Sequence, residues 1–95
     1  MKIRWSNEAA ADFIAILRYI HEENPAASLR VSERMSRTVN QLKKFPYRGR
    51  PGRLEGTREL VLPPLPFVVV YRVKQDAVEI ARVLHGAQQW PAANP

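Results

Sequence analysis

The sequence predicts an α/β (α+β) fold in which an antiparallel two-helix hairpin packs on a small, mainly antiparallel, twisted β-sheet. Three observations lead to this expectation. In the first half of the chain, apolar residues recur every three or four positions, as they do on the buried face of a helix. One Asn24-Pro25 pair interrupts this pattern, so two helices joined by a very short link should be neighbours. The second half contains three apolar, β-branched runs with brief connections, which is typical of an antiparallel meander.

The composition indicates one globular domain spanning residues 1–95, with 45% apolar and 25% charged residues. The absence of cysteine excludes disulfides and thiolate metal sites, and the two histidines are far apart, so we expect no metal site and no cofactor. No apolar run is long enough to cross a bilayer, and no apolar signal segment is found at the N-terminus. We therefore expect a soluble cytoplasmic protein without a membrane partner.

The N-terminal segment Lys2-Ile3-Arg4-Trp5 alternates polar and apolar residues and predicts a short strand. Ser6 is then expected to cap a helix, with Glu8 in the first turn, where the helix dipole favours an anion. The predicted apolar face of this helix comprises Ala9, Phe13, Ile16, Leu17 and Ile20. Its predicted polar side comprises Asp12, Arg18, Glu22 and Glu23.

A second helix is expected from residue 25 to about residue 44, because proline suits the first turn and Phe45-Pro46 ends the periodic pattern. Its predicted buried face comprises Ala27, Val31, Met35, Val39 and Leu42. Both helices are expected to cover one face of the sheet.

Residues 47–57 are rich in Gly, Pro and Arg and are expected to form a loop. Strands are expected at residues 58–62, 67–73 and 77–84. The middle run is continuously apolar, so it should be a central strand covered on both faces. Residues 86–95 form a short tail that contains Trp90.

The net charge of +6 is concentrated between residues 43 and 58, where six basic residues are opposed only by Glu55. Eleven of the 15 basic residues are arginine, which suits bidentate contacts with phosphate or carboxylate groups. This basic segment indicates an anionic partner, such as nucleic acid, a nucleoprotein machine or an acidic protein segment. The alternative is a solvated loop that keeps a small protein soluble. Tyr47 within it either stacks on a base or packs locally beside its proline neighbour.

A series of short motifs carries a resemblance to a known family. The motifs are Trp5-Ser6, Asn24-Pro25, Phe45-Pro46, Gly49-Arg50-Pro51-Gly52-Arg53, Gly56-Thr57-Arg58-Glu59-Leu60-Val61, Val70-Tyr71-Arg72-Val73, Val83-Leu84-His85-Gly86 and Gln89-Trp90-Pro91. With these motifs, nearly the whole chain resembles the RelE/ParE superfamily of bacterial toxins from type II toxin–antitoxin modules, and more closely its ParE-like branch. The small α/β fold of that superfamily agrees with the fold expected above.

The resemblance implies one of two targets. ParE-like members inhibit DNA gyrase and block replication, whereas RelE-like members cleave mRNA in the ribosomal A site. RNA cleavage requires groups that activate the ribose 2′-hydroxyl, stabilise the phosphorane and protonate the leaving oxygen. The candidates for these roles are Arg58, Arg82 and His85, with Glu59 as a base.

Two departures from the ribonuclease pattern favour gyrase binding over RNA cleavage. Many ribonuclease members carry a basic residue just before a Val-Tyr pair, but this chain has Phe67-Val68-Val69-Val70-Tyr71, with no ionisable side chain before Tyr71. Those members also often carry a C-terminal tyrosine, whereas Trp90 cannot shuttle a proton. We therefore expect a toxin that binds DNA gyrase without catalysis. The alternatives are a ribosome-dependent mRNA interferase and a non-toxic regulatory or structural module of the same fold.

The residues expected to contact a target or partner are Arg48, Arg50, Arg53, Arg58 and Trp90. Trp90 is either an interface anchor or a cap that folds back on the core edge. His85 is either an acid–base group or a strand-end histidine with local hydrogen bonds. The resemblance implies a cognate antitoxin encoded by an adjacent gene, which forms a hetero-oligomer with this protein. We expect an acidic, amphipathic antitoxin segment to fill an apolar groove beside the helix hairpin or to add to a sheet edge.

Overall fold

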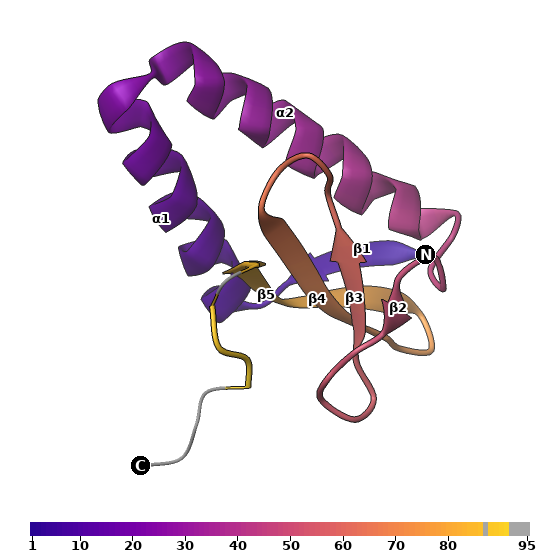
Figure 1. The fold of residues 1–95 in the computed structure, drawn as a ribbon. Coiled ribbons are helices and arrows are strands. Elements are labelled where there is room, and N and C mark those ends of the chain that lie inside the picture. The colour runs from indigo at the N-terminus through magenta and orange to yellow at the C-terminus, as the bar shows by residue number, and fades with distance from the viewer. Residues whose placement is uncertain (87, 92–95) are drawn as a thin grey trace.

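The computed structural model describes residues 1–86 and 88–91 and confirms the predicted α/β architecture (Figure 1). The elements in chain order are β1 (Lys2–Trp5), α1 (Asn7–Glu23), α2 (Pro25–Asn40), a 3₁₀ turn η1 (Gln41–Lys43), β2 (Arg50–Pro51), β3 (Arg58–Val61), β4 (Phe67–Val73) and β5 (Ala77–His85). The strands form one mixed sheet in the order β1-β5-β4-β3-β2, in which β1 is parallel to β5 and the other neighbours are antiparallel. No helix within the described residues is long and apolar enough to cross a membrane.

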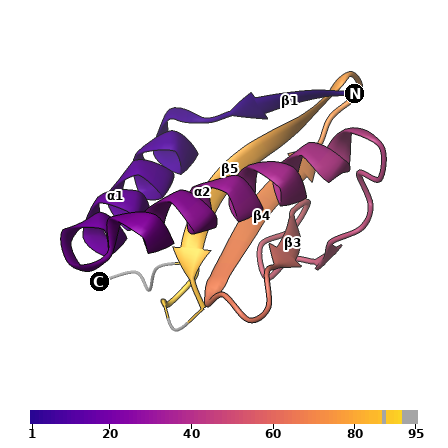
Figure 2. The ribbon, with the colours of Figure 1, turned by 90° about the horizontal axis from the view of Figure 1, so that it is seen from above.

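The two helices form a hairpin, opened into a V, that covers one face of the sheet (Figures 1 and 2). Seen from above, α2 crosses over β5 and β4 (Figure 2). Asn24 makes the sharp reversal between the helices, because its backbone N–H donates to the Ile20 carbonyl while its side chain accepts from the N–H of Ala27. Pro25 follows in the first turn of α2, as the sequence predicts.

The hydrophobic core lies between the hairpin and the sheet. Met35 and Leu42 from the second half of the hairpin and Ile80 from β5 are inaccessible to solvent. The predicted apolar face of α1 is confirmed, since its side chains belong to this core or pack against it. Of the face predicted for the second helix, Val31, Met35 and Val39 lie in the core, Leu42 reaches it from η1, and Ala27 is not part of it. β4 is buried from residue 67 to residue 71, so both of its faces are covered, as its continuous apolar run predicts.

Ser6 fixes the corner between β1 and α1 to the sheet. Its side-chain oxygen accepts a hydrogen bond from the N–H of Ala9 and thereby caps α1, at 3.0 Å. Its hydroxyl donates to the carbonyl of Ala81 at 3.0 Å, and its backbone N–H donates to the carbonyl of Ile80 at 2.9 Å. The register of β4 against β5 shifts beside Ala81, which leaves the carbonyl of that residue available. The predicted helix cap therefore also ties the helix to β5.

Two expected boundaries differ from the structure. α2 ends at Asn40, before the expected boundary near residue 44, because the chain tightens into the 3₁₀ turn and the Gln41 carbonyl accepts from the N–H groups of Lys44 and Phe45. The expectation of an unbroken loop over residues 47–57 is wrong, since Arg50 and Pro51 pair with β3. A two-residue strand has no periodicity to detect, and its proline is tolerated because β2 lies at the edge of the sheet.

We predict that Ser6→Ala lowers the free energy of unfolding by about 1–2 kcal/mol, because it removes both the cap of α1 and the hydrogen bond to Ala81. The measurement is urea unfolding followed by circular dichroism. Ser36→Ala is the matched control, since Ser36 is exposed in the middle of α2. Equal stabilities of the two variants would contradict the assignment of Ser6 as the fixed corner.

Candidate functional site

Tyr71 anchors the loop of residues 47–57, which lies within the basic segment and which we call the basic loop. It is fully buried in β4, and its hydroxyl donates to the carbonyl of Pro46 and accepts from the N–H of Gly49, each at 2.8 Å. A Cβ atom on Gly49 would lie 2.7 Å from the tyrosine oxygen, so only glycine allows this approach. Burial raises the pKa of Tyr71, which therefore remains a protonated donor at neutral pH.

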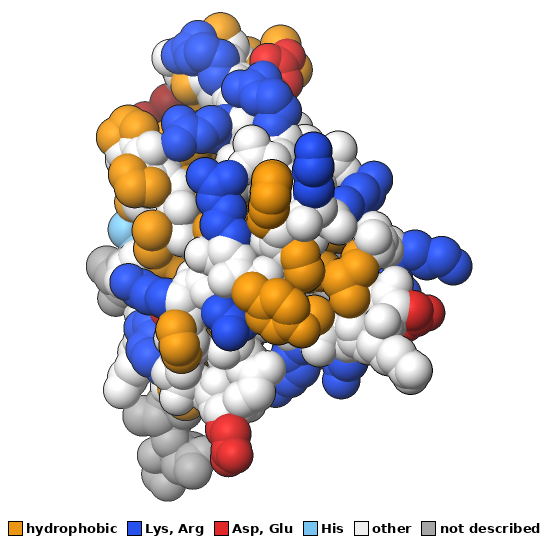
Figure 3. Space-filling model, turned by 90° about the vertical axis from the view of Figure 1, so that its right-hand side faces the viewer, with side chains coloured by type: hydrophobic (Ala, Val, Ile, Leu, Met, Phe, Trp, Pro, Cys, Tyr) orange, Lys and Arg blue, Asp and Glu red, His pale blue; other side chains and the backbone are white. Residues whose placement is uncertain are grey.

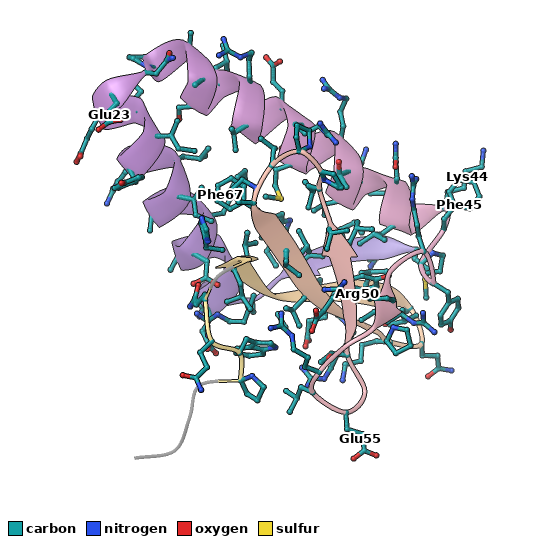
Figure 4. All side chains as sticks on the ribbon, viewed as in Figure 1. Glu23, Lys44, Phe45, Arg50, Glu55 and Phe67 are labelled. Atoms are coloured by element: carbon teal, nitrogen blue, oxygen red, sulfur yellow. The ribbon has the colours of Figure 1, made fainter. Side chains whose placement is uncertain are left out.

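Glu59 on β3 holds the loop from inside. Its side chain is 1% exposed, and one carboxylate oxygen accepts from the backbone N–H of Arg53 at 2.9 Å and from the Nε of Arg53 at 3.0 Å. The other oxygen accepts from Nη2 of Arg50 at 3.2 Å and from Nη2 of Arg53 at 3.3 Å. Figure 4 shows Arg50 on the short strand β2 and Glu55 at the tip of the loop beyond it. Two of the arginines expected to contact a partner thus also neutralise a buried carboxylate.

The pKa of Glu59 reflects these contacts. Burial alone would raise it, but hydrogen bonds from Arg53 and Arg50 outweigh burial and lower the pKa from 4.5 to about 2. The group is therefore ionised at neutral pH and accepts a proton poorly. This environment favours a structural anchor over the role of base considered for Glu59 in RNA cleavage.

Arg58 and Arg48 support the same loop from outside. Nη1 of Arg58 donates to the carbonyl of Gly49 at 2.7 Å and to that of Tyr47 at 3.3 Å. The Cζ of Arg58 lies 5.0 Å from the centroid of the Tyr47 ring. Nη1 of Arg48 donates to the side chain of Gln41 at 2.6 Å and stays exposed. The loop is thus fixed on both sides while its cations remain near the surface.

Arg82 on β5 forms an ion pair with α1. Its Nε and Nη2 atoms donate to the two carboxylate oxygens of Asp12 at 2.7 and 3.1 Å, and Asp12 also accepts from the N–H of Val83 at 3.0 Å. The prediction that Asp12 lies on the polar side of α1 is wrong, because this carboxylate closes the edge of β5 beyond the end of β1. The hydrogen bond to Asp12 raises the pKa of Arg82. The Trp90 ring lies 5.3 Å from the Cζ of Arg82, so this tryptophan folds back onto the sheet.

The four residues considered for RNA cleavage are divided between the two faces of the sheet. They are Arg58, Glu59, Arg82 and His85. Glu59 and Arg82 both align with Val70, so these side chains share the face away from the helices. His85 lies three residues beyond Arg82 and pairs with Phe67, so its ring lies on the helix-facing side, edge-on to Phe67 at 6.1 Å. Arg58 precedes Glu59 and therefore also leaves the sheet on the opposite face from Glu59.

The outer face of β4, away from the helices, separates Glu59 from Arg82 with apolar side chains. Val70, which pairs with both Glu59 and Arg82, is fully buried between them. Val68, two residues earlier on the same face of β4, is also buried. Val68 pairs with Val61 on β3 and with Leu84 on β5, so no ionisable side chain lies directly beside it on the neighbouring strands. Among the described residues, no group of three His, Cys, Asp or Glu side chains could hold a metal ion.

Basic side chains dominate one side of the molecule. Figure 3 looks onto the side formed by the N-terminus, α2 and the basic loop, and its Lys and Arg side chains spread over the face while acidic ones lie near the margins. The sequence from residue 34 to residue 54 contains seven basic residues and no acidic one. The electrostatic potential of this side is therefore positive and suits an anionic partner.

An apolar groove of about 500 Å³ lies between the hairpin, the loop after β3 and the end of β5. Its apolar lining includes Ile16, Tyr19, Val31, Leu65 and Phe67. A second hollow of about 490 Å³ shares Val31 and Leu65 with it. It is lined by three arginines of α2, Arg30, Arg34 and Arg37, and by one acidic residue, Glu33. The two hollows together form an apolar groove that continues into a basic stripe.

The sequence alone missed the roles of Tyr71 and Asp12. A signal existed for Tyr71, because a tyrosine in an otherwise aliphatic buried strand needs a partner for its hydroxyl. Gly49, whose N–H is one such partner, lies 22 residues earlier in the sequence, so the sequence does not identify it. For Asp12 no local signal exists, since its partner Arg82 lies 70 residues away in the sequence.

Comparisons with known proteins relate this geometry to toxins. A family model described as the ParE toxin of the type II toxin–antitoxin system parDE matches residues 3–90. The chain is 43% identical over 90 residues to Y4kP of Sinorhizobium fredii, which is named as a toxin, covering 95% of this chain and 93% of that protein. It is 36% identical over 87 residues to toxin RelE2 of Caulobacter vibrioides, covering 92% and 97%.

Solved structures of toxin–antitoxin systems share the fold. One from the chromosomal ParDE system of P. aeruginosa superposes with a TM-score of 0.81 at 30% identity, covering 90% of this chain and 95% of that chain. The RelBE2 toxin–antitoxin complex of Mycobacterium tuberculosis gives a TM-score of 0.58 at 26% identity, covering 88% and 95%.

We predict that the stability of the protein falls in acid because of Glu59. Its pKa is lower in the folded state than the ordinary value of 4.5, so its stabilisation is complete above pH 4.5 and is lost as the pH falls toward about 2. The lowering of the Glu59 pKa from 4.5 to about 2 corresponds to about 3 kcal/mol in the free energy of unfolding. Chemical unfolding at several pH values should show this loss in the native protein and not in Glu59→Gln. Glu55→Gln, on the exposed tip of the same loop, should keep the native profile, and a Glu59→Gln profile parallel to the native one would refute the anchor.

Proposed function

Because the chain belongs to the ParE toxin family of type II toxin–antitoxin systems, we propose that it inhibits DNA gyrase by binding to it and thereby blocks replication. In this proposal the protein acts as a binding poison and not as a catalyst. The basic loop, with Arg48 as an exposed cation that does not bind Glu59, contributes to the contact with the target.

One observation carries the choice of binding over RNA cleavage. The four residues that could serve a ribonuclease lie on two faces of the sheet, and the charges of two of them are engaged within the protein. Glu59 is bound by Arg50 and Arg53, and Arg82 is bound by Asp12. General acid–base catalysis needs such groups within hydrogen-bond reach of one substrate atom. The described arrangement does not supply that convergence.

A ribosome-dependent mRNA interferase is the second candidate. It is kept because relatives named RelE2 and RelE1 are 36% and 29% identical to this chain. Residue types alone do not separate the two activities, since the basic loop suits a ribosomal RNA environment as well as a gyrase–DNA complex. The two candidates therefore need one experiment with both targets.

We predict that the purified protein inhibits supercoiling of relaxed plasmid by DNA gyrase and does not cleave mRNA in a translating ribosome extract. Arg48→Glu should weaken the inhibition by about 1 kcal/mol, or about fivefold, and more strongly at low salt, because it removes a favourable charge interaction at the surface. Arg18→Glu is the matched control, since Arg18 is an exposed arginine on α1. Unimpaired supercoiling together with position-specific mRNA cleavage would reverse the assignment in favour of the ribosome.

The sequence alone would suggest Arg50 and Arg53 as the positions for charge reversal. The structure makes Arg48 the better choice. The side chains of Arg50 and Arg53 bind Glu59, so two new carboxylates there would face a buried carboxylate and unfold the loop. The Arg48 side chain instead donates to the neutral side chain of Gln41, so its reversal leaves the Glu59 anchor intact.

We further propose a cognate antitoxin as the partner that neutralises the protein. Structural neighbours come from ParDE and RelBE toxin–antitoxin systems, which supports such a partner. The apolar groove between the hairpin and Phe67 suits the apolar face of a helix, and Arg30, Arg34 and Arg37 suit acidic residues that flank it. A segment of this kind is disordered when free and folds on binding, so proteolysis of the antitoxin would release the toxin.

We predict that Ala15→Asp weakens binding of the antitoxin encoded by the adjacent gene by about tenfold or more, because it puts a carboxylate in the apolar groove opposite an acidic partner. The measurement is isothermal titration calorimetry of the purified proteins. Ala26→Asp, at an exposed position of α2 outside the groove, should bind with nearly native affinity. Equal affinities for the two variants would show that the antitoxin binds another surface. Separate elution of the native proteins at low salt would show that the two proteins do not form a complex.

A further inference from the structure

Two aromatic rings stand exposed at the entrance to the basic loop, and the fold does not account for their exposure. Phe45 is 55% exposed and Tyr47 is 65% exposed. Tyr47 does pack locally, against the guanidinium of Arg58, but most of its ring remains exposed. Together with Lys44 and Arg48, these residues form what we call the aromatic–basic corner. Figure 4 shows Lys44 and Phe45 projecting outward at the end of the helix hairpin.

Each exposed ring is accompanied by a cation. The Nζ atom of Lys44 lies 5.8 Å from the centroid of the Phe45 ring, and the guanidinium of Arg58 lies 5.0 Å from that of Tyr47. Residues 44–48 also line a hollow of about 610 Å³. The corner therefore combines flat apolar surfaces, positive charge and open space at one place.

The backbone of the corner is held rigidly although its rings are exposed. The N–H of Phe45 donates to the carbonyl of Gln41 at 2.9 Å, and the carbonyl of Pro46 accepts from the buried hydroxyl of Tyr71 at 2.8 Å. Arg58 binds the Tyr47 carbonyl at 3.3 Å. A partner that docks on the rings would not have to order this backbone first, which favours affinity.

We propose that the aromatic–basic corner binds single-stranded nucleic acid. Bases stack on the solvent-exposed faces of Phe45 and Tyr47, and Lys44 and Arg48 contact the phosphates. Single-stranded nucleic acid fits this combination because each exposed ring has a cation beside it, so a base can stack where a phosphate is also neutralised. Duplex nucleic acid would fit less well, since its base faces are already stacked on one another.

The proposal is tested by fluorescence anisotropy with a short fluorescein-labelled oligothymidylate, the matching oligouridylate and a DNA duplex of the same length. The assay contains neither gyrase nor ribosome, so its failure and the failure of the proposed function are separate results. We expect single strands to bind more tightly than the duplex. A preference for oligothymidylate would indicate DNA as the natural strand, and a preference for oligouridylate would indicate RNA.

Phe45→Ala and Tyr47→Ala should each weaken binding of the single strands by about 5- to 100-fold, because each removes a stacking surface. Tyr47→Phe should retain nearly native affinity, since it keeps the ring. Tyr19→Ala is the control, because Tyr19 is 74% exposed on α1, away from the corner. Lys44→Gln with Arg48→Gln should lower the dependence of log K on log salt by about 0.7 for each phosphate that is no longer neutralised.

Circular dichroism of every variant verifies that the exposed substitutions leave the fold intact. Ring-deletion variants that bind as tightly as the native protein would overturn the proposal, because charge alone would then explain the binding. Equal affinity for duplex and single strands, or no binding at low salt, would overturn it as well.

Discussion

The buried carboxylate of Glu59 is the interaction on which the candidate functional surface depends. It lies beneath the basic loop, whose cations would otherwise repel one another. It forms ion pairs with two of them, Arg50 and Arg53. A buried charge is costly unless it is fully hydrogen-bonded, and here the backbone of Arg53 and two guanidinium groups satisfy it. The loop can therefore present arginines at the surface while its backbone stays in one conformation. The hydroxyl of Tyr71 completes this arrangement from the neighbouring strand.

Much of the fold follows from local patterns in the sequence. β4 was predictable with both boundaries, because its apolar, largely β-branched run is interrupted only by Arg72. Ser6 and Asn24 were predictable as helix caps from their residue types. The pairing of β1 with β5 was not predictable, since alternation tells which face a side chain occupies and not which strand lies beside it. β2 was missed because two residues carry no period.

The candidate site was predictable in composition but not in connectivity. The sequence shows the cluster of basic residues between positions 43 and 58, and most of these side chains are exposed in the structure. Which carboxylate each arginine binds depends on the tertiary structure, as the pairing of Arg82 with Asp12 across the sheet edge demonstrates. Arginine thus forms a structural ion pair at Arg82, whereas at Arg48 it lies exposed at the surface. A set of catalytic candidates drawn from residue types alone cannot separate these uses, whereas strand register can.

The parallel pairing of β1 with β5 has a consequence for synthesis of the protein. β1 is synthesised well before β5, its only partner in the described sheet, and the hydrogen bond from Ser6 to Ala81 spans 75 positions. Contacts of such long range form late, because the chain between them must be closed first. The helix hairpin can form during translation, whereas the sheet that supports the basic loop stays incomplete until β5 has left the ribosome. A nascent chain that has not yet completed β5 therefore lacks the finished support of the basic loop.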